Sequence, residues 1–143
     1  MNKKGVTLIE LIIVMVIIAI GAVLLAPNIG AWLPNYRLRS ATRDIASTMR
    51  LAQMKAVSNN MEYRVSFIGG SYILQRNSGG WQDDGPTQTL PTGITINTIT
   101  FPDSHAEFNP NSTSSTGSMT LINTKKTEKK ITLTPSTGKI KIE

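Results

Sequence analysis

The sequence predicts an α+β protein in which a long N-terminal transmembrane helix continues into a small domain of antiparallel β-sheet. Three observations predict this class. An apolar run fills residues 6–26, a helical spacing of apolar residues follows over residues 36–59, and short alternating segments make up the rest. The second half of the helix should pack on the sheet, because an apolar stripe left alone would stay in contact with water. The 143 residues suffice for one such domain.

The apolar run is long enough to cross a lipid bilayer. It covers 21 positions from Val6 to Ala26 (26 − 6 + 1), about 31 Å as a helix. Two lysines precede the run and three arginines follow it, so positive charge does not decide its orientation. A secretory signal peptide needs a small-x-small cleavage site after its apolar core, whereas Ala19-Ile20-Gly21 lies inside this run. We therefore expect a retained anchor.

Glu10 is the one charged residue of the apolar run. A carboxylate costs about 2.5–3.5 kcal/mol at the bilayer centre and less near the membrane surface. Two interpretations follow. In one, Glu10 lies at headgroup depth and is tolerated there. In the other, it pairs with a cation inside the apolar environment.

The first ten residues, Met1-Asn2-Lys3-Lys4-Gly5-Val6-Thr7-Leu8-Ile9-Glu10, resemble the class III signal of type IV pilins and type II secretion pseudopilins. The shared pattern is a short basic leader, a glycine, an apolar residue, Thr-Leu, an apolar residue and a glutamate before a long apolar helix. The resemblance implies that a prepilin peptidase cleaves after Gly5 and that Val6 becomes N-methylated, leaving 138 residues (143 − 5). It also implies that Glu10 meets the N-terminal amine of a neighbouring subunit in a filament.

The same resemblance implies a location and partners. The chain would cross the bacterial inner membrane once, with its C-terminal domain in the periplasm or outside, and would then enter a filament or pseudopilus. Its partners would be other pilin or pseudopilin subunits, the prepilin peptidase, the inner-membrane assembly platform and membrane lipid. Gly21 and Pro27 would let the helix bend or melt, because glycine weakens a helix and proline removes a helical N–H. Alternatively, Pro27 only ends the membrane span.

The remaining elements follow from periodicity. Residues 36–59 should form an amphipathic helix that ends near Asn59-Asn60, and its apolar stripe consists of Leu38, Ala41, Ile45, Met49, Ala52 and Ala56. Residues 62–68 and 71–76 should form a hairpin around Gly69-Gly70. Residues 94–101, 119–123, 130–134 and 139–142 should be strands, and residues 77–91 and 109–117 should be loops. The expected divisions are a leader (1–5), a hydrophobic helix (6–27), an amphipathic helix (28–60) and a sheet domain (61–143).

A second resemblance covers most of the sheet domain. Residues 46–60 followed by Val65 and Phe67, and the ending from Ile131 to Lys141, are similar to the pseudopilin H and minor-pilin T group. The absence of cysteine argues against a major pilin with a C-terminal disulfide loop. The resemblance therefore implies a minor subunit of a type II secretion pseudopilus or type IV pilus, which supports protein export or pilus assembly.

DNA binding for DNA uptake is the alternative function. Residues 125–143 hold six lysines and two glutamates, a net charge of +4, whereas residues 62–107 carry −3 from two arginines and five carboxylates. Some minor pilins of the T type contact DNA through Gly-Arg-x-Arg, and Gly138-Lys139-Ile140-Lys141 matches it with lysine in both arginine positions. In a strand, Lys139 and Lys141 would share one face. The competing interpretation is that they are merely the solvated face of that strand.

Catalytic and metal chemistry have little support in the sequence. The chain has no cysteine and one histidine, His105, which we expect in a loop with a structural or solvated role. Calcium would need the carboxylates of Asp83, Asp84, Asp103 and Glu107, but these lack EF-hand spacing. We therefore expect no metal site, no cofactor and no enzyme activity. A membrane-anchored enzyme would require perturbed polar groups around His105.

Overall fold

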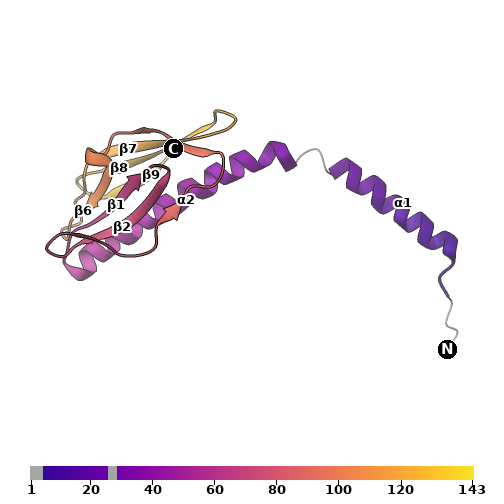
Figure 1. Cartoon of the computed structure of the whole chain (residues 1–143), viewed down its shortest axis with the longest axis horizontal. Helices are drawn as coiled ribbons and strands as arrows, with labels where there is room; N and C mark the ends of the chain where they lie inside the picture. The colour runs from indigo at the N-terminus through magenta and orange to yellow at the C-terminus, as the bar shows by residue number, and fades with distance from the viewer. Residues whose placement is uncertain (1–4, 26–28) are drawn as a thin grey trace. The chain divides into compact units, whose positions relative to one another are not determined.

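The computed structural model describes residues 5–25 and 29–143. The chain divides into two compact units, Met1–Leu33 and Pro34–Glu143. The first unit contains helix α1, and the second contains most of helix α2 and all of the β-strands (Figure 1).

Helix α1, Leu8–Leu25, is apolar on every side. The backbone carbonyl of Thr7 accepts hydrogen bonds from the N–H groups of Glu10 and Leu11 at 3.1 and 3.3 Å, so the first helical turn follows directly on Thr7. The large apolar side chains of residues 8–24 are exposed, down to 48% at Ile12. A helix that is apolar all round is typical of a segment that other apolar groups surround. Among the described residues, no helix combines the length and the apolar character needed to span a membrane.

Helix α2, Ile29–Asn59, ends where the Asn59-Asn60 pair predicts and begins ahead of the apolar stripe. It continues through Pro34, although proline cannot donate a hydrogen bond to the carbonyl of Gly30. The predicted stripe is confirmed, because each of its residues is at most 2% exposed: Leu38, Ala41, Ile45, Met49, Ala52 and Ala56. Three of these are alanines, whose small side chains allow the helix backbone to lie close to the sheets.

One sheet has five strands. They are β1 (Tyr63–Ile68), β2 (Ser71–Asn77), β3 (Trp81–Asp83), β4 (Gln88–Thr89) and β6 (His105–Phe108). The strand order is β3-β2-β1-β6, and β4 pairs separately with β2. The predicted hairpin is confirmed, since Ile68 lies opposite Ser71. Gly69 and Gly70 make the turn with φ angles of 54° and 85°, which glycine adopts without strain.

The other sheet has four strands in the order β5-β7-β8-β9. They are β5 (Ile94–Ile99), β7 (Gly117–Asn123), β8 (Glu128–Thr134) and β9 (Lys139–Ile142). All pairings in both sheets are antiparallel. A short 3-10 helix, Pro102–Ser104, precedes β6.

Three details differ from the sequence prediction. The strands form two sheets rather than one. Residues 77–91, predicted as a loop, contain the short strands β3 and β4, which pair with β2. His105, also predicted in a loop, begins β6, where it lies opposite Ser66 of β1. These segments are short and polar, so it is pairing with a longer strand, rather than their own periodicity, that makes them β-structure.

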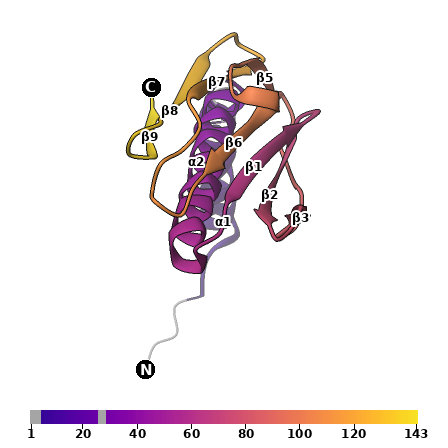
Figure 2. The same cartoon turned by 90° about the vertical axis from the view of Figure 1, so that its left-hand side faces the viewer.

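The hydrophobic core lies between α2 and both sheets. In Figure 2, β1 to β3 lie to one side of α2 and β8 and β9 to the other. Fully buried core residues include Ile45 and Met49 of α2, Val65 of β1, Leu121 of β7 and Ile131 of β8. Every residue of this core lies within Pro34–Glu143, so the second unit contains its own core.

Candidate assembly and anion-binding sites

The Gly5–Glu10 motif lies where the chain enters α1. Gly5 and Val6 precede the helix, and Val6 is 74% exposed, so the peptide bond between them lies in accessible, non-helical backbone. The Thr7 hydroxyl accepts a hydrogen bond from the Glu10 N–H at 3.4 Å. Thr7 therefore occupies the N-cap position and Glu10 the third helical position, which is the Thr-x-x-Glu spacing of a capping box.

Glu10 has a local explanation as well as an assembly role implied by resemblance. Its carboxylate lies in the first turn of α1, where the positive end of the helix dipole favours a negative charge by about 0.3–1 kcal/mol. The side chain is exposed and forms no ion pair with the cations that the structure describes. The first turn thus favours a carboxylate at this position and leaves it accessible to a cation from outside the chain.

Gly21 and Pro27 were predicted to make the helix flexible. Gly21 lies within α1, and a Cβ atom added to it would meet nothing within 4 Å. No close packing within the described residues therefore demands glycine at this position. Pro27 lies outside the described residues, as does Ala26, the last residue of the apolar run.

Lys139 and Lys141 lie on β9, an edge strand of the four-stranded sheet. Both are exposed, and Ile140 between them packs against the core, as the alternation predicts. Ile142 is 37% exposed, so it faces the core only in part. Lys141 forms an ion pair with Glu143 at 2.6 Å between Nζ and Oε1, and this contact lowers the pKa of Glu143. The neighbouring carboxylate reduces the positive charge that this strand presents.

Gly138, the glycine of the Gly-Lys-Ile-Lys segment, is needed by the fold. It is buried and has a φ angle of 60°, in the left-handed region that residues with a Cβ rarely adopt. An added Cβ would also lie against the side-chain amide of Gln53 and at 3.0 Å from the carbonyl oxygen of Ser112. The turn before β9 therefore explains this glycine without a ligand.

A stronger concentration of positive charge lies on the other side of the sheet, where β8 and β9 meet α2. A pocket of about 210 Å³ is lined there by Arg39, Thr42, Arg43, Lys129 and Ile142, and we call it the basic pocket. Arg39 and Arg43 are four residues apart and therefore neighbours on the helix surface. Its three cations form no ion pair with any carboxylate that the structure describes.

His105 is half-buried, and its Nδ1 atom is buried without a hydrogen-bond partner. Burial lowers the pKa of His105, and the positive charge of Arg64 acts in the same direction. Glu107 and Asp103 oppose this shift. Arg64 itself stacks on the ring of Trp81 at 4.1 Å. The lowered pKa means that this environment favours the neutral imidazole over the charged one.

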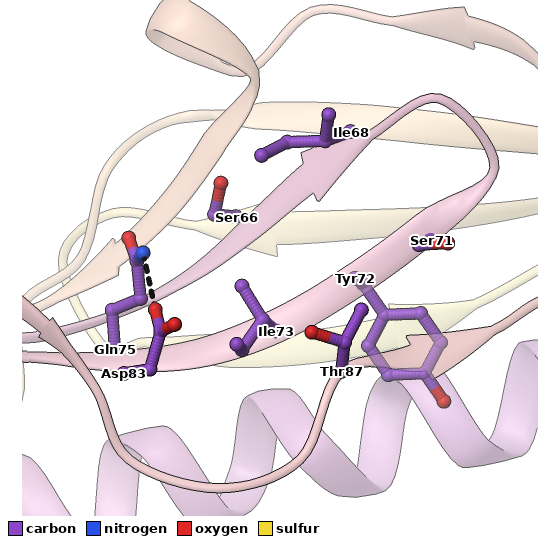
Figure 3. A pocket seen from close by; sticks show the side chains of 8 residues that line it. All are labelled: Ser66, Ile68, Ser71, Tyr72, Ile73, Gln75, Asp83 and Thr87. Atoms are coloured by element: carbon purple, nitrogen blue, oxygen red, sulfur yellow. Dashed lines mark hydrogen bonds between the residues drawn. The ribbon is translucent and has the colours of Figure 1, made fainter.

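A cavity of about 360 Å³ lies over β1 and β2 (Figure 3). Ile68 and Ile73 are its apolar contacts, and the amide of Gln75 donates a hydrogen bond to Asp83 Oδ1 at 2.8 Å on its rim. Its lining contains Ser66 but not His105, so the histidine does not belong to this cavity. In the described parts of the chain, no three His, Cys, Asp or Glu residues gather in a way that would hold a metal ion. Asp84, one of the candidate calcium ligands, pairs instead with Lys55 at 2.6 Å.

Known families match both parts of the chain. A prokaryotic N-terminal methylation motif matches residues 1–26. The family of the type II transport protein GspH matches residues 41–137, more than half of the chain. The chain belongs to the GspH family. This family is the one described as the type II transport protein GspH, and the methylation motif lies ahead of its matched region.

Two solved structures share the fold of this GspH protein. One is the minor pseudopilin EpsH from the type 2 secretion system of Vibrio cholerae, with 10% identity and a TM-score of 0.64 over 75% of this chain and 96% of that chain. A crystal structure also of EpsH from Vibrio cholerae has 10% identity and a TM-score of 0.60, over 77% and 94% of the two chains. At this identity the likeness concerns the fold, and it confirms the pilin-like α+β class. No curated protein sequence matches the chain.

Two features of this GspH protein were not predicted from sequence. The N-cap hydrogen bond between the Glu10 N–H and the Thr7 hydroxyl could have been predicted from the Thr-x-x-Glu spacing. For the basic pocket, the sequence could predict only that Arg39 and Arg43 are neighbours on the helix surface, from their four-residue spacing. Lys129 lies 86 residues beyond Arg43 (129 − 43), and only the packing of β8 beside α2 brings them together.

Proposed function

We propose that the chain is cut after Gly5, methylated on Val6 and assembled into the type II secretion pseudopilus through helix α1. The observation that carries this proposal is a helix that is apolar on every side and begins directly after the Gly5–Glu10 motif. Before assembly, we propose, the apolar run holds the chain in the bacterial inner membrane as a single-pass protein, with Pro34–Glu143 in the periplasm. The prepilin peptidase and the inner-membrane assembly platform would be its partners there, together with membrane lipid.

Assembly would exchange contacts with lipid for contacts with the helices of neighbouring subunits. Because lipid tails are as apolar as leucine, close van der Waals packing and polar pairing supply the free energy of helix association in membranes. Glu10 would supply the polar pair by accepting the charge of a neighbour's methylated N-terminus at Val6. Gly21 and Pro27 would allow the helix to bend as the subunit leaves the bilayer.

The first experiment is intact-mass and N-terminal analysis of the protein recovered from its native membrane. Loss of Met1 to Gly5 together with a methyl group on Val6 is the expected result. A chain that keeps its leader, or one cut beyond Ala19, would contradict the proposal.

Variants of Glu10 separate its charge from its capping role. Glu10→Gln keeps a side chain that fits the capping box but removes the charge, whereas Glu10→Val removes both. If pairing with an amine drives assembly, both variants should insert in the membrane and both should be depleted from the pseudopilus. The measurement is the amount of subunit that co-purifies with sheared pseudopili, relative to the amount in the membrane. Assembly of Glu10→Gln at the wild-type level would contradict the pairing.

Assembly into a type IV pilus and binding of DNA are the alternatives. DNA binding would use Lys139 and Lys141, and the +4 net charge of residues 125–143 favours it. Two observations weigh against it. Lys141 already pairs with Glu143, and Gly138 has a structural role in the turn.

A further inference from the structure

The basic pocket brings together three cations that form no ion pair with a described carboxylate. Arg39 and Arg43 come from α2 and Lys129 from β8, so three positive charges converge on about 210 Å³. Arg39 and Arg43 are exposed and Lys129 is half-buried. Ile142 adds an apolar contact to the same pocket. Like charges held this close repel one another, so the arrangement favours an anion between them.

The neighbouring surface adds to this charge. Asn123, at the end of β7, donates a hydrogen bond from Nδ2 to Asn35 Oδ1 of α2 at 2.8 Å. This bond holds the turn between β7 and β8 against α2, one helical turn before Arg39. The turn presents Lys126, which is exposed. The basic surface therefore extends from Arg43 along the helix toward its start.

Arginine and lysine differ in what they recognise. A guanidinium group presents a planar fork that matches two oxygens of one phosphate. Arg39 and Arg43 both line the basic pocket, so the pocket offers two such forks. An exposed Tyr36 lies on the same flank of α2 as Arg39 and Arg43, at spacings of three and seven residues. We propose that the basic pocket binds the phosphate of an anionic phospholipid headgroup.

The choice of a lipid headgroup rests on the proposed function, which places the chain in a membrane. Helix α2 begins at Ile29, three positions after the apolar run ends at Ala26. Trp32 and Tyr36 follow, 60% and 52% exposed, and these are the residue types that concentrate at membrane surfaces. Basic residues near a membrane surface attract anionic lipids. In the sequence, the apolar run is followed by this aromatic pair and then by Arg39 and Arg43 of the basic pocket.

The test uses the full chain in nanodiscs that contain equal amounts of phosphatidylglycerol and phosphatidylcholine. Native mass spectrometry counts the lipids that stay bound when the nanodisc is removed. Wild type should retain phosphatidylglycerol over phosphatidylcholine. Arg39→Gln combined with Arg43→Gln should lower that preference by about fivefold for each arginine, the effect expected of a basic residue near an anionic surface.

A matched control removes the same charge elsewhere. Arg50→Gln combined with Arg76→Gln changes two exposed arginines on α2 and β2, and it should keep the wild-type preference. An equal loss in both double variants would mean that total charge rather than the pocket selects the lipid, and would overturn the proposal. Arg39→Lys with Arg43→Lys keeps the charge but removes both forks. It should retain less phosphatidylglycerol than wild type and more than the glutamine variant.

A second arm separates the headgroup from a free anion. Inorganic phosphate is titrated against the full chain in neutral detergent while NMR follows the Nε–H signals of Arg39 and Arg43. Movement of these signals, with no effect of the arginine variants on lipid retention, would identify a free-anion site and overturn the lipid proposal. Neither arm depends on cleavage or filament assembly. If the protein is cleaved and assembled normally but does not select phosphatidylglycerol, only this inference is rejected. If it selects phosphatidylglycerol but is not cleaved or assembled, only the proposed function is rejected.

Discussion

At the residue scale, Glu10 combines a favourable local position in α1 with the assembly role proposed for it above. In α1 it occupies the third helical position after the N-cap Thr7, where the helix dipole and the capping spacing both favour it. That local contribution reduces the cost of a carboxylate at the edge of an apolar helix. The charge remains unpaired within the described chain and is therefore available to a neighbouring subunit.

Gly138 shows that the glycine of a short sequence motif can be required by the fold rather than by a ligand. The resemblance to Gly-Arg-x-Arg gave this glycine a place in a DNA-binding motif, but its positive φ angle and the close carbonyl of Ser112 already require glycine. A short motif that contains a turn glycine can therefore recur because of the turn alone. The functional content of such a motif lies in the side chains that follow it, and here one of the two lysines is paired with a carboxylate.

His105 carries a prediction about pH. Burial and Arg64 lower its pKa in the folded state, while Glu107 and Asp103 oppose the shift; Ser66 faces it from β1. Because the folded pKa lies below the unfolded value, the unfolded state takes up a proton first as pH falls. The contribution of His105 to the free energy of unfolding should therefore be fully present above the unfolded pKa, about 6.5. It should decrease as pH falls from there toward the folded pKa.

His105→Gln is the variant that checks this prediction, because His105 is the only histidine in the chain. Urea unfolding of the full chain in detergent is measured at intervals from pH 7 to pH 5.5, above the range in which most carboxylates titrate. The wild type should lose stability over this range and the variant should lose less. Equal slopes for the two proteins would show that the imidazole has the same pKa in both states.

At the element scale, α2 shows which parts of a fold can be read from a sequence. Its three- and four-residue spacing predicted six buried positions, and all six are at most 2% exposed. The hairpin of β1 and β2 was equally readable, because Gly69-Gly70 separates two alternating segments. Strong local periodicity and turn chemistry are sufficient for such elements.

The strands that the sequence did not predict form only because they pair with a longer strand. Strand β4 has two residues and β6 has four, too few to establish an alternation, and each exists because a longer strand offers free hydrogen-bonding groups. The division into two sheets has the same origin, since β5 pairs with β7 rather than with the β1–β2 hairpin. Lys129 joins the basic pocket only through this arrangement. Contacts between distant segments therefore set the part of the candidate site that periodicity does not predict.

The buried stripe of α2 makes a measurable prediction. Ile45→Ala removes three carbon atoms from a side chain that is 0% exposed and should lower the free energy of unfolding by about 2–5 kcal/mol. Leu51→Ala is the control on the same helix, because Leu51 is 41% exposed, and it should cost less than about 1 kcal/mol. Chemical denaturation of both variants in detergent gives the two values. Similar losses of the free energy of unfolding in the two variants would mean that the buried stripe of α2 does not contribute more to stability than its exposed face.

At the scale of the whole molecule, stability and assembly belong to different parts of the chain. Among the described residues, the hydrophobic core begins at Leu38, whereas the prepilin-like motif and the apolar helix lie before Pro34. The apolar side chains that the structure describes on α1 are exposed and are not among the residues of this core. The chain can therefore present an apolar helix for assembly without weakening its folded domain.

Two truncated chains test this division. A chain of residues 34–143 retains every core residue and should unfold cooperatively at the same denaturant concentration as the full chain, while being absent from pseudopili. A chain of residues 39–143 also loses Leu38, which is 1% exposed, and the hydrogen bond from Asn123 to Asn35. It should be less stable by about 3 kcal/mol or more, because burial of a leucine alone accounts for about 2–5 kcal/mol. If residues 34–143 were as unstable as residues 39–143, the part of the chain before Pro34 would have to contribute to the fold, and assembly through α1 would then carry a cost in stability.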